Sequence, residues 1–238
     1  MTARKLLLAY AGDVILGAPE EASPFEAFGS VVDRVQEAAY APDRNRGALV
    51  TGVLIGGAAL TARRAGLVKT VWATLGGHAL RDDAQTLAAL LDEGEVDGAR
   101  ELLGALTGVD AEQLGVPEIR STAVEWLAGG TADAVVGPLL WASLLGPAGA
   151  ASFAAVNTLD ARLDDHDQFG WAAARLAQAM NWPVARRTAA LSMWVAPALP
   201  EGDELTRAIN RSLYVGAAAA LTCAVIRWGL KKTPSPSR

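Results

Sequence analysis

The densest acidic cluster of this chain lies in the stretch AVNTLDARLDDHDQFGWAAARL, residues 155–176. Its carboxylates at Asp160, Asp164 and Asp167 are spaced three or four residues apart. Carboxylate oxygens grouped in this way can hold Mg²⁺, which prefers oxygen ligands and bridges phosphate groups. The other interpretation is a solvated acidic loop between two helices. Which one applies depends on the apolar segment that precedes the cluster.

That segment, residues 134–156, contains no ionisable group over 23 residues. A helix of about 20 such residues crosses a bilayer. Pro147 and Gly149 leave a second possibility open, a break that produces a re-entrant pair. Asp133 stands immediately before the segment, where an acidic residue is either favoured by the helix dipole or part of a site.

Four shorter apolar runs suggest that this segment is not alone. They cover residues 6–19, 48–62, 188–200 and 213–226, and each is 13 to 15 residues long. Runs of this length fit buried core helices and membrane helices equally well. Trp and Tyr near their ends and Gly inside them are typical of membrane packing. We expect an all-α, multi-pass helical membrane protein forming one membrane domain over residues 1–238, with a soluble helical bundle as the alternative.

The middle of the chain has a different character. Residues 71–127 contain leucines at helical spacing with acidic residues between them, which predicts two amphipathic helices joined at residues 92–95. Buried in hydrocarbon, each central charge costs about 2.5–3.5 kcal/mol even on a lenient scale. We therefore expect a water-facing helical insertion here. Residues 24–39 form another predicted amphipathic helix.

Composition excludes several classes of function. The net charge is −5 and there is no basic stripe, which argues against a nucleic-acid partner. The single cysteine, Cys223, excludes a disulfide framework and a cysteine-ligated zinc site. His78 and His166 share no metal-ligand spacing, and neither a GxxxxGK[ST] loop nor a Gly-x-Ser-x-Gly elbow occurs.

Three stretches, taken in order, resemble one known family. They are STAVEWLAGGTADAVVGPLLW at residues 121–141, AVNTLD at residues 155–160, and FGWAAARL at residues 169–176 followed by NWPVARRTA. They are similar to the adenosylcobinamide-phosphate synthases, the CobD/CbiB membrane proteins of cobalamin biosynthesis. The stretches KLLLAYAGDVILG, PDRNRGAL, LDEGEVDGARELLGALTGVD and EGDELTRAINRSL resemble further parts of that family.

The chain also departs from the family pattern. Gly129 and Gly130 stand where the family has Glu-Asn, and Ala132 and Ala134 replace the Ser and Gly that flank the aspartate. The loop after NTLD is shorter, and the family stretch SPNAGWPEAAMAGAL has no counterpart. These losses support an alternative, a catalytically degenerate membrane paralogue that binds a corrinoid or supports a biosynthetic complex.

The resemblance implies an enzyme that joins adenosylcobyric acid to aminopropanol or aminopropanol phosphate through an amide bond. It implies ATP and Mg²⁺ as cofactors, a corrinoid and an amino alcohol as small-molecule partners, the lipid bilayer as surroundings, and a multi-pass position in the cell membrane. The oligomeric state and the identity of the amine do not follow from it.

Residue chemistry then assigns expected roles within this reaction. Asp160 and Asp133 are the expected catalytic carboxylates, and Glu125 is the expected base. Asp160 and Asp164 are the expected metal ligands. The expected substrate-binding residues are Asn157, Thr158, Thr131, Phe169, Trp171 and Arg175.

Overall fold

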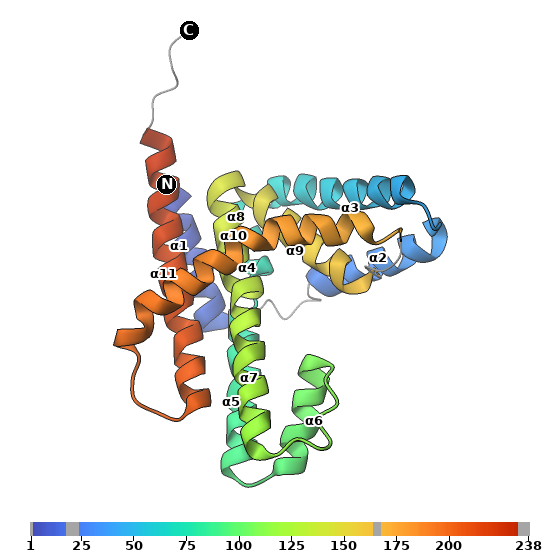
Figure 1. Cartoon of the computed structure of the whole chain (residues 1–238). Coiled ribbons are helices and arrows are strands. Elements are labelled where there is room, and N and C mark those ends of the chain that lie inside the picture. Colours follow the sequence, from blue (N-terminus) through green and yellow to red (C-terminus); the bar gives the residue numbers. More distant parts are fainter. Residues whose placement is uncertain (1, 18–23, 164–167, 233–238) are drawn as a thin grey trace.

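The computed structural model describes residues 2–17, 24–163 and 168–232, and those residues form helices without any strand (Figure 1). A π-helical turn, η1 (Ala132–Val136), joins α7 to α8, and a 3-10 turn, η2 (Ala196–Ala198), follows α10. The helices are α1 (Thr2–Leu16), α2 (Pro24–Ala39), α3 (Arg44–Ala65), α4 (Leu67–Thr74), α5 (Gly77–Asp92), α6 (Val96–Thr107), α7 (Val116–Thr131), α8 (Gly137–Leu145), α9 (Pro147–Arg162), α10 (Trp171–Val195) and α11 (Glu204–Lys232).

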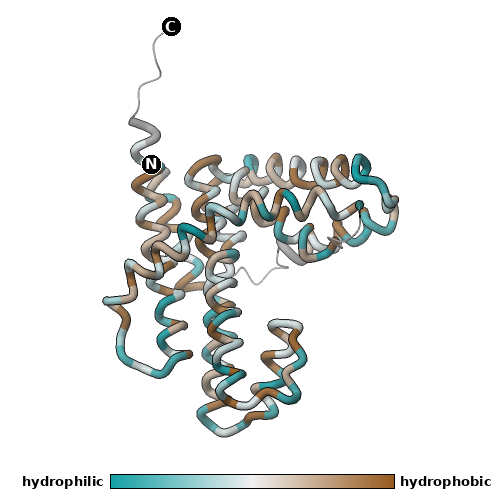
Figure 2. The backbone as a smooth tube through the Cα atoms, viewed as in Figure 1, coloured by the Kyte–Doolittle hydropathy of each residue, from teal (hydrophilic) through white to brown (hydrophobic). Residues whose placement is uncertain are grey.

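The expected all-α, multi-pass membrane architecture is confirmed. Within the described residues, three segments are long and apolar enough to cross a bilayer: α3, the continuous α7–η1–α8 segment, and α11 from Glu204 to Gly229. Figure 2 shows hydrophilic residues gathered at the turn from α2 to α3, in the α5–α6 region and in the loop before α11. The amphipathic helix expected over residues 24–39 is present as α2, and the pair joined at residues 92–95 is present as α5 and α6.

The uncharged run of residues 134–156 is not one helix. It breaks at Gly146, whose φ of 73° is a conformation that glycine adopts readily. Arg227 of α11 stabilises the break, because its Nη1 donates to the carbonyl oxygens of Ser143 and Leu144 at 3.0 and 3.1 Å. These carbonyls lie in the last turn of α8, where they lack partners within the helix. Helix α9 then packs back against α8, so the interpretation with a break at this point is the correct one.

Close packing in this hairpin yields a stability prediction. A Cβ atom at Gly149 would lie 2.3 Å from the backbone oxygen of Trp141 and 2.8 Å from Cβ of Leu145. Backbone cannot move aside as a side chain can, so we expect Gly149→Ala to destabilise the protein by about 1–3 kcal/mol. Thermal unfolding in one detergent would measure this.

The matched control for that experiment is Gly129→Ala. Gly129 is exposed on α7, and a Cβ there would meet nothing within 4 Å. Alanine favours helix by about 1 kcal/mol over glycine, so this variant should unfold at the same temperature as the wild type or slightly above it. A Gly149→Ala protein as stable as Gly129→Ala would contradict the packing argument.

The described residues form four apolar cores, of which the two largest lie in different parts of the molecule. The larger one joins α1, α4, α8, α9 and α11 through fully buried side chains such as Leu6, Val71, Leu139 and Phe153. Cys223 is buried in the same core. A separate core joins α5, α6 and α7 to the start of α11. The segment expected to face water, residues 71–127, therefore packs into both cores. Val71 and Leu75 at its start belong to the larger core, and most of its other buried residues belong to the separate one.

Charged side chains connect α5 and α7 to the start of α11. Arg120 of α7 donates to Asp92 at 3.2 Å and to Asp203 at 2.8 Å. Asp203 precedes α11 and accepts a hydrogen bond from the backbone N–H of Thr206 at 2.6 Å. Hydrogen bonds from Thr206, together with Arg120, hold the pKa of the Asp203 carboxyl below its ordinary value.

We therefore expect Asp203→Ala to lose about 1 kcal/mol of stability through the lost helix cap. Because the pKa is lowered on folding, the contribution of Asp203 is present above its ordinary pKa of about 3.9 and is lost as the pH falls through the lowered value. Urea unfolding of the wild type and Asp203→Ala at neutral and acidic pH would measure both effects. A difference between them that grows on acidification would contradict this account.

Candidate functional site

A pocket of about 480 Å³ lies where η1, α8 and α9 meet the turn between α4 and α5. It brings together two segments that the sequence singled out: Asp133 comes from η1, and Asn157 and Thr158 come from the last turns of α9. The complete lining is Thr74, Gly76, Asp133, Ala134, Pro138, Ala154, Asn157, Thr158, Ala161 and Arg162.

The hydroxyl groups of the pocket have their donors occupied. Thr158 donates to the carbonyl oxygen of Ala154 at 2.9 Å, and Thr74 donates to that of Val71 at 3.0 Å. Each hydroxyl oxygen keeps lone pairs that accept hydrogen bonds. Together with the exposed carboxylate of Asp133, they form an acceptor-rich part of the pocket that suits a donor such as an amine.

Donors come from Asn157 and Arg162. The amide oxygen of Asn157 accepts from Nδ2 of Asn181 on α10 at 3.1 Å, and this assigned orientation leaves the Asn157 NH₂ group for a ligand. Arg162 Nη1 bonds to Asp33 of α2 at 2.5 Å. A guanidinium carries five N–H donors, so Arg162 can bind an anion while it keeps this ion pair.

Helix α2 is shaped to accept Arg162. A Cβ atom at Gly29 would lie 2.6 Å from Cζ of Arg162. A larger residue at this position would require the Arg162 side chain to shift. Arg162 thus lies at the edge of the pocket and against α2.

A buried polar contact lies behind the pocket. Asp13 of α1 is completely buried and accepts a long hydrogen bond of 3.5 Å from the backbone N–H of His78 in the first turn of α5. The His78 ring contacts the carbonyl oxygen of Val14 at 3.3 Å. Next to it, the N–H of Gly76 donates to the carbonyl oxygen of Ala134 at 3.1 Å. These contacts fix the start of α5 against η1, and with it the position of Asp133.

Six predicted site residues that the structure describes lie outside the pocket lining, and three of them belong to α7 and α9. Asp160 is half-buried and does not line the pocket. It follows Thr158 by two residues, so it is turned by about 200° around α9 and faces another side. Glu125 is exposed on α7, away from the pocket lining. Thr131 is buried, where its hydroxyl bonds to Ser212 at 2.8 Å and to the carbonyl oxygen of Leu127.

The predicted aromatic residues form a different group near the start of α10. Phe169 is only 1% exposed and packs against Tyr40 with ring centroids 5.6 Å apart. Trp171 lies under the guanidinium of Arg44 at 5.3 Å. Arg175 bonds to Gln178 at 2.9 Å. The pocket lining includes none of the three predicted residues, and Phe169 is a core residue here.

Of the two predicted metal ligands, only Asp160 belongs to the described residues. Asp164 lies outside the described residues, as do Asp165, His166 and Asp167. In the ranges that the structure describes, no group of three or more His, Cys, Asp or Glu side chains is placed to hold a metal ion.

Sequence reasoning missed Arg162 and Thr74. Arg162 follows Thr158 by four residues and therefore lies on the same face of a helix, so the helical spacing could have identified it. Thr74 lies far away in the sequence, in α4. No local pattern could have placed it here.

The fold and the pocket define the class of protein: a multi-pass helical membrane protein with a pocket beside a helical hairpin. Comparison with known families makes this specific. The family described as CobD/CbiB protein matches residues 6–236, nearly the whole chain. The chain belongs to this family.

Individual relatives agree with this membership. The cobalamin biosynthesis protein CobD of Mycobacterium tuberculosis is 38% identical over 200 residues, which cover 78% of this chain and 64% of the relative. That of Rhodobacter capsulatus is 34% identical over 58% of this chain and 41% of the relative. The Chromobacterium violaceum protein is 31% identical over 74% and 64%, respectively. The chain thus spans less than two thirds of these relatives, and no solved structure matches it.

Proposed function

We propose that this protein catalyses the amide-forming step of cobalamin biosynthesis in the cell membrane, as an adenosylcobinamide-phosphate synthase. The observation that carries the proposal is the pocket that unites Asp133 with Asn157 and Thr158. These residues come from the two stretches with the strongest family resemblance, and they are far apart in the sequence. The names of the relatives, cobalamin biosynthesis protein CobD, support the pathway.

The pocket has the chemistry for an amino alcohol that carries a phosphate. In the proposed complex the amine donates to the hydroxyl oxygens of Thr74 and Thr158 and to the carboxylate of Asp133. The phosphate accepts from Arg162 and from the NH₂ group of Asn157; hydrogen bonds to a charged group contribute about 1.5–3 kcal/mol each. An amine attacks an acyl carbon only after it has lost a proton, and Asp133 is the group placed to accept that proton. Activation by ATP would let the oxygen lost from the carboxylate of adenosylcobyric acid leave with a phosphate group as the C–N bond forms.

ATP and Mg²⁺ remain part of the proposal through the family resemblance alone. The described lining supplies one carboxylate, Asp133, and no glycine-rich phosphate loop. Magnesium in nucleotide sites is bound by one or two carboxylates together with the phosphates and several waters. With Asp133 assigned to the amine, the described residues of the pocket do not form a site for this ion.

The proposal is tested with the purified protein in detergent. It would be incubated with adenosylcobyric acid, aminopropanol phosphate, ATP and Mg²⁺, and the amide product would be identified by its mass. Growth rescue of a strain that lacks the synthase is the parallel test in cells. Product formation and rescue are the expected results; a stable membrane-inserted protein that gives neither contradicts the enzyme.

The second candidate is a degenerate paralogue that binds a corrinoid without catalysis. Gly129 and Gly130 in place of Glu-Asn, and the missing SPNAGWPEAAMAGAL stretch, favour it. Copurification of a corrinoid with a protein that neither forms product nor rescues growth would support this candidate.

A further inference from the structure

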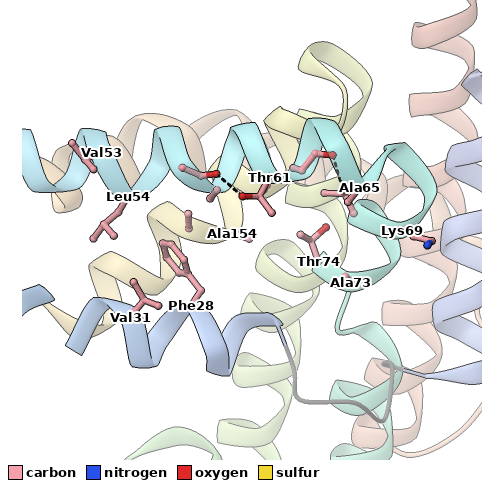
Figure 3. Close-up of a pocket in the computed structure, with 16 residues that line it drawn as sticks. Phe28, Val31, Val53, Leu54, Thr61, Ala65, Lys69, Ala73, Thr74 and Ala154 are labelled. Atoms are coloured by element: carbon pink, nitrogen blue, oxygen red, sulfur yellow. Dashed lines mark hydrogen bonds between the residues drawn. The ribbon is translucent and has the colours of Figure 1, made fainter. Parts of the chain in front are cut away.

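A second, larger pocket of about 670 Å³ opens along α3 (Figure 3). Helices α2, α4 and α9 complete its walls. Its lining is dominated by small and apolar side chains: Phe28, Val31, Val53 and Leu54 lie toward one end, and alanines line much of the remainder. We refer to it as the α3 groove. It is separate from the proposed catalytic residues, although Thr74 and Ala154 border both pockets.

The α3 groove faces outward on a helix that has the length and composition to cross a bilayer. Only 11% of the apolar window of α3 is buried within the protein. A Cβ atom at Gly57, in the wall of the groove, would meet nothing within 4 Å. This face is therefore open to whatever surrounds the protein, and around a membrane helix the surroundings are lipid chains.

Hydrogen bonding in the groove favours a hydrocarbon occupant. Thr61 donates to the carbonyl oxygen of Gly57 at 2.9 Å, and Thr70 donates to that of Ala62 at 3.1 Å, as the dashed lines in Figure 3 show. Thr74 likewise donates to Val71. Because these hydroxyls are satisfied by backbone, they do not require a polar ligand. An acyl chain can fill the groove without leaving any of these donors unpaired.

One end of the groove is basic. Lys69 is the only charged residue among the described residues that line it, and Figure 3 places it at one end of the groove, next to Ala65 and Ala73. The last turn of α3 adds two exposed arginines, Arg63 and Arg64. Cations beside a hydrophobic groove attract anionic lipid headgroups, at about 1 kcal/mol for each Lys or Arg near the surface.

We propose that the α3 groove binds one anionic phospholipid, with an acyl chain along α3 and the phosphate at Lys69. The α3 groove is a second pocket that shares Thr74 and Ala154 with the first, and the proposal does not depend on the amide-forming chemistry. A second copy of this chain packed on α3 is the competing occupant, and the experiment distinguishes the two.

The test uses the full chain reconstituted with equal amounts of phosphatidylglycerol and phosphatidylcholine, followed by native mass spectrometry. Gly57→Leu places a side chain in the groove, at a position where a Cβ atom would meet nothing within 4 Å. Gly56→Leu is the matched control, because Gly56 is equally open but does not line the groove. Lys69→Gln removes the charge at an exposed position and leaves the groove intact.

We expect the wild type and Gly56→Leu to retain phosphatidylglycerol and Gly57→Leu to lose it. Lys69→Gln should keep a lipid but lose about fivefold in its preference for phosphatidylglycerol, the factor that about 1 kcal/mol represents. Equal lipid retention by Gly57→Leu and Gly56→Leu would overturn the proposal. So would equal retention of the two lipids by the wild type, or a dimer that only Gly57→Leu disrupts.

Discussion

Asp133→Asn is expected to lower the rate of amide formation by at least about a hundredfold, the lower end of what a positioned general base contributes. Asparagine has the same size and still bonds to a donor, but it cannot accept the proton of the attacking amine. Asp133 is the only carboxylate among the described residues that line the pocket, so no neighbour there can replace it. Product formation by the purified protein at saturating amine measures the loss.

The matched control for this experiment is Asp160→Asn. Asp160 lies at the end of α9, close to the pocket in sequence but outside its lining. The residue pattern made Asp160 the first expected catalytic carboxylate, whereas the geometry favours Asp133. If Asp160→Asn loses as much activity as Asp133→Asn, the chemistry extends to the end of α9 and the pocket alone is not the site. A near-normal rate for Asp160→Asn supports the pocket.

The helices were predictable where apolar periodicity was regular. Residues 24–39 and the pair around residues 92–95 have leucines, valines or phenylalanines at helical spacing, and they form α2, α5 and α6. The uncharged run of residues 134–156 was harder to interpret, because hydropathy alone does not indicate where a helix ends. Gly146 and Pro147 interrupt it, and Arg227, distant in the sequence, satisfies the carbonyls that the break exposes. That tertiary contact is invisible in the local sequence.

The pocket was predictable in part for a related reason. The resemblance singled out Asp133, Asn157 and Thr158, and the fold brings them together. It also singled out Asp160 without regard to the helical face, although two residues of helix turn a side chain to nearly the opposite side. Phe169 and Trp171 were expected among the substrate-binding residues. The fold instead packs Phe169 against Tyr40 and places Arg44 over Trp171.

Arg162→Gln is expected to raise the KM for aminopropanol phosphate by about 10- to 150-fold, which corresponds to about 1.5–3 kcal/mol for hydrogen bonds to a charged group. The kcat should change little, because in the proposed complex Arg162 binds the phosphate and takes no part in proton transfer. Arg162→Lys keeps the charge but not the planar fork, and an intermediate KM is expected. Initial rates against amine concentration provide both constants.

Loss of Arg162 also removes an ion pair with Asp33, so a structural effect must be separated from a binding effect. Asp33→Asn breaks the same pair from α2 while leaving the guanidinium at the pocket. It should therefore keep a nearly normal KM, with any loss limited to stability. Unphosphorylated aminopropanol supplies the second comparison, because it offers Arg162 no anion and its KM should be the same in the wild type and in Arg162→Gln. If Asp33→Asn raises the KM as much as Arg162→Gln does, or if both amines lose affinity equally, Arg162 acts through the packing of α2 on α9 and the phosphate lies elsewhere.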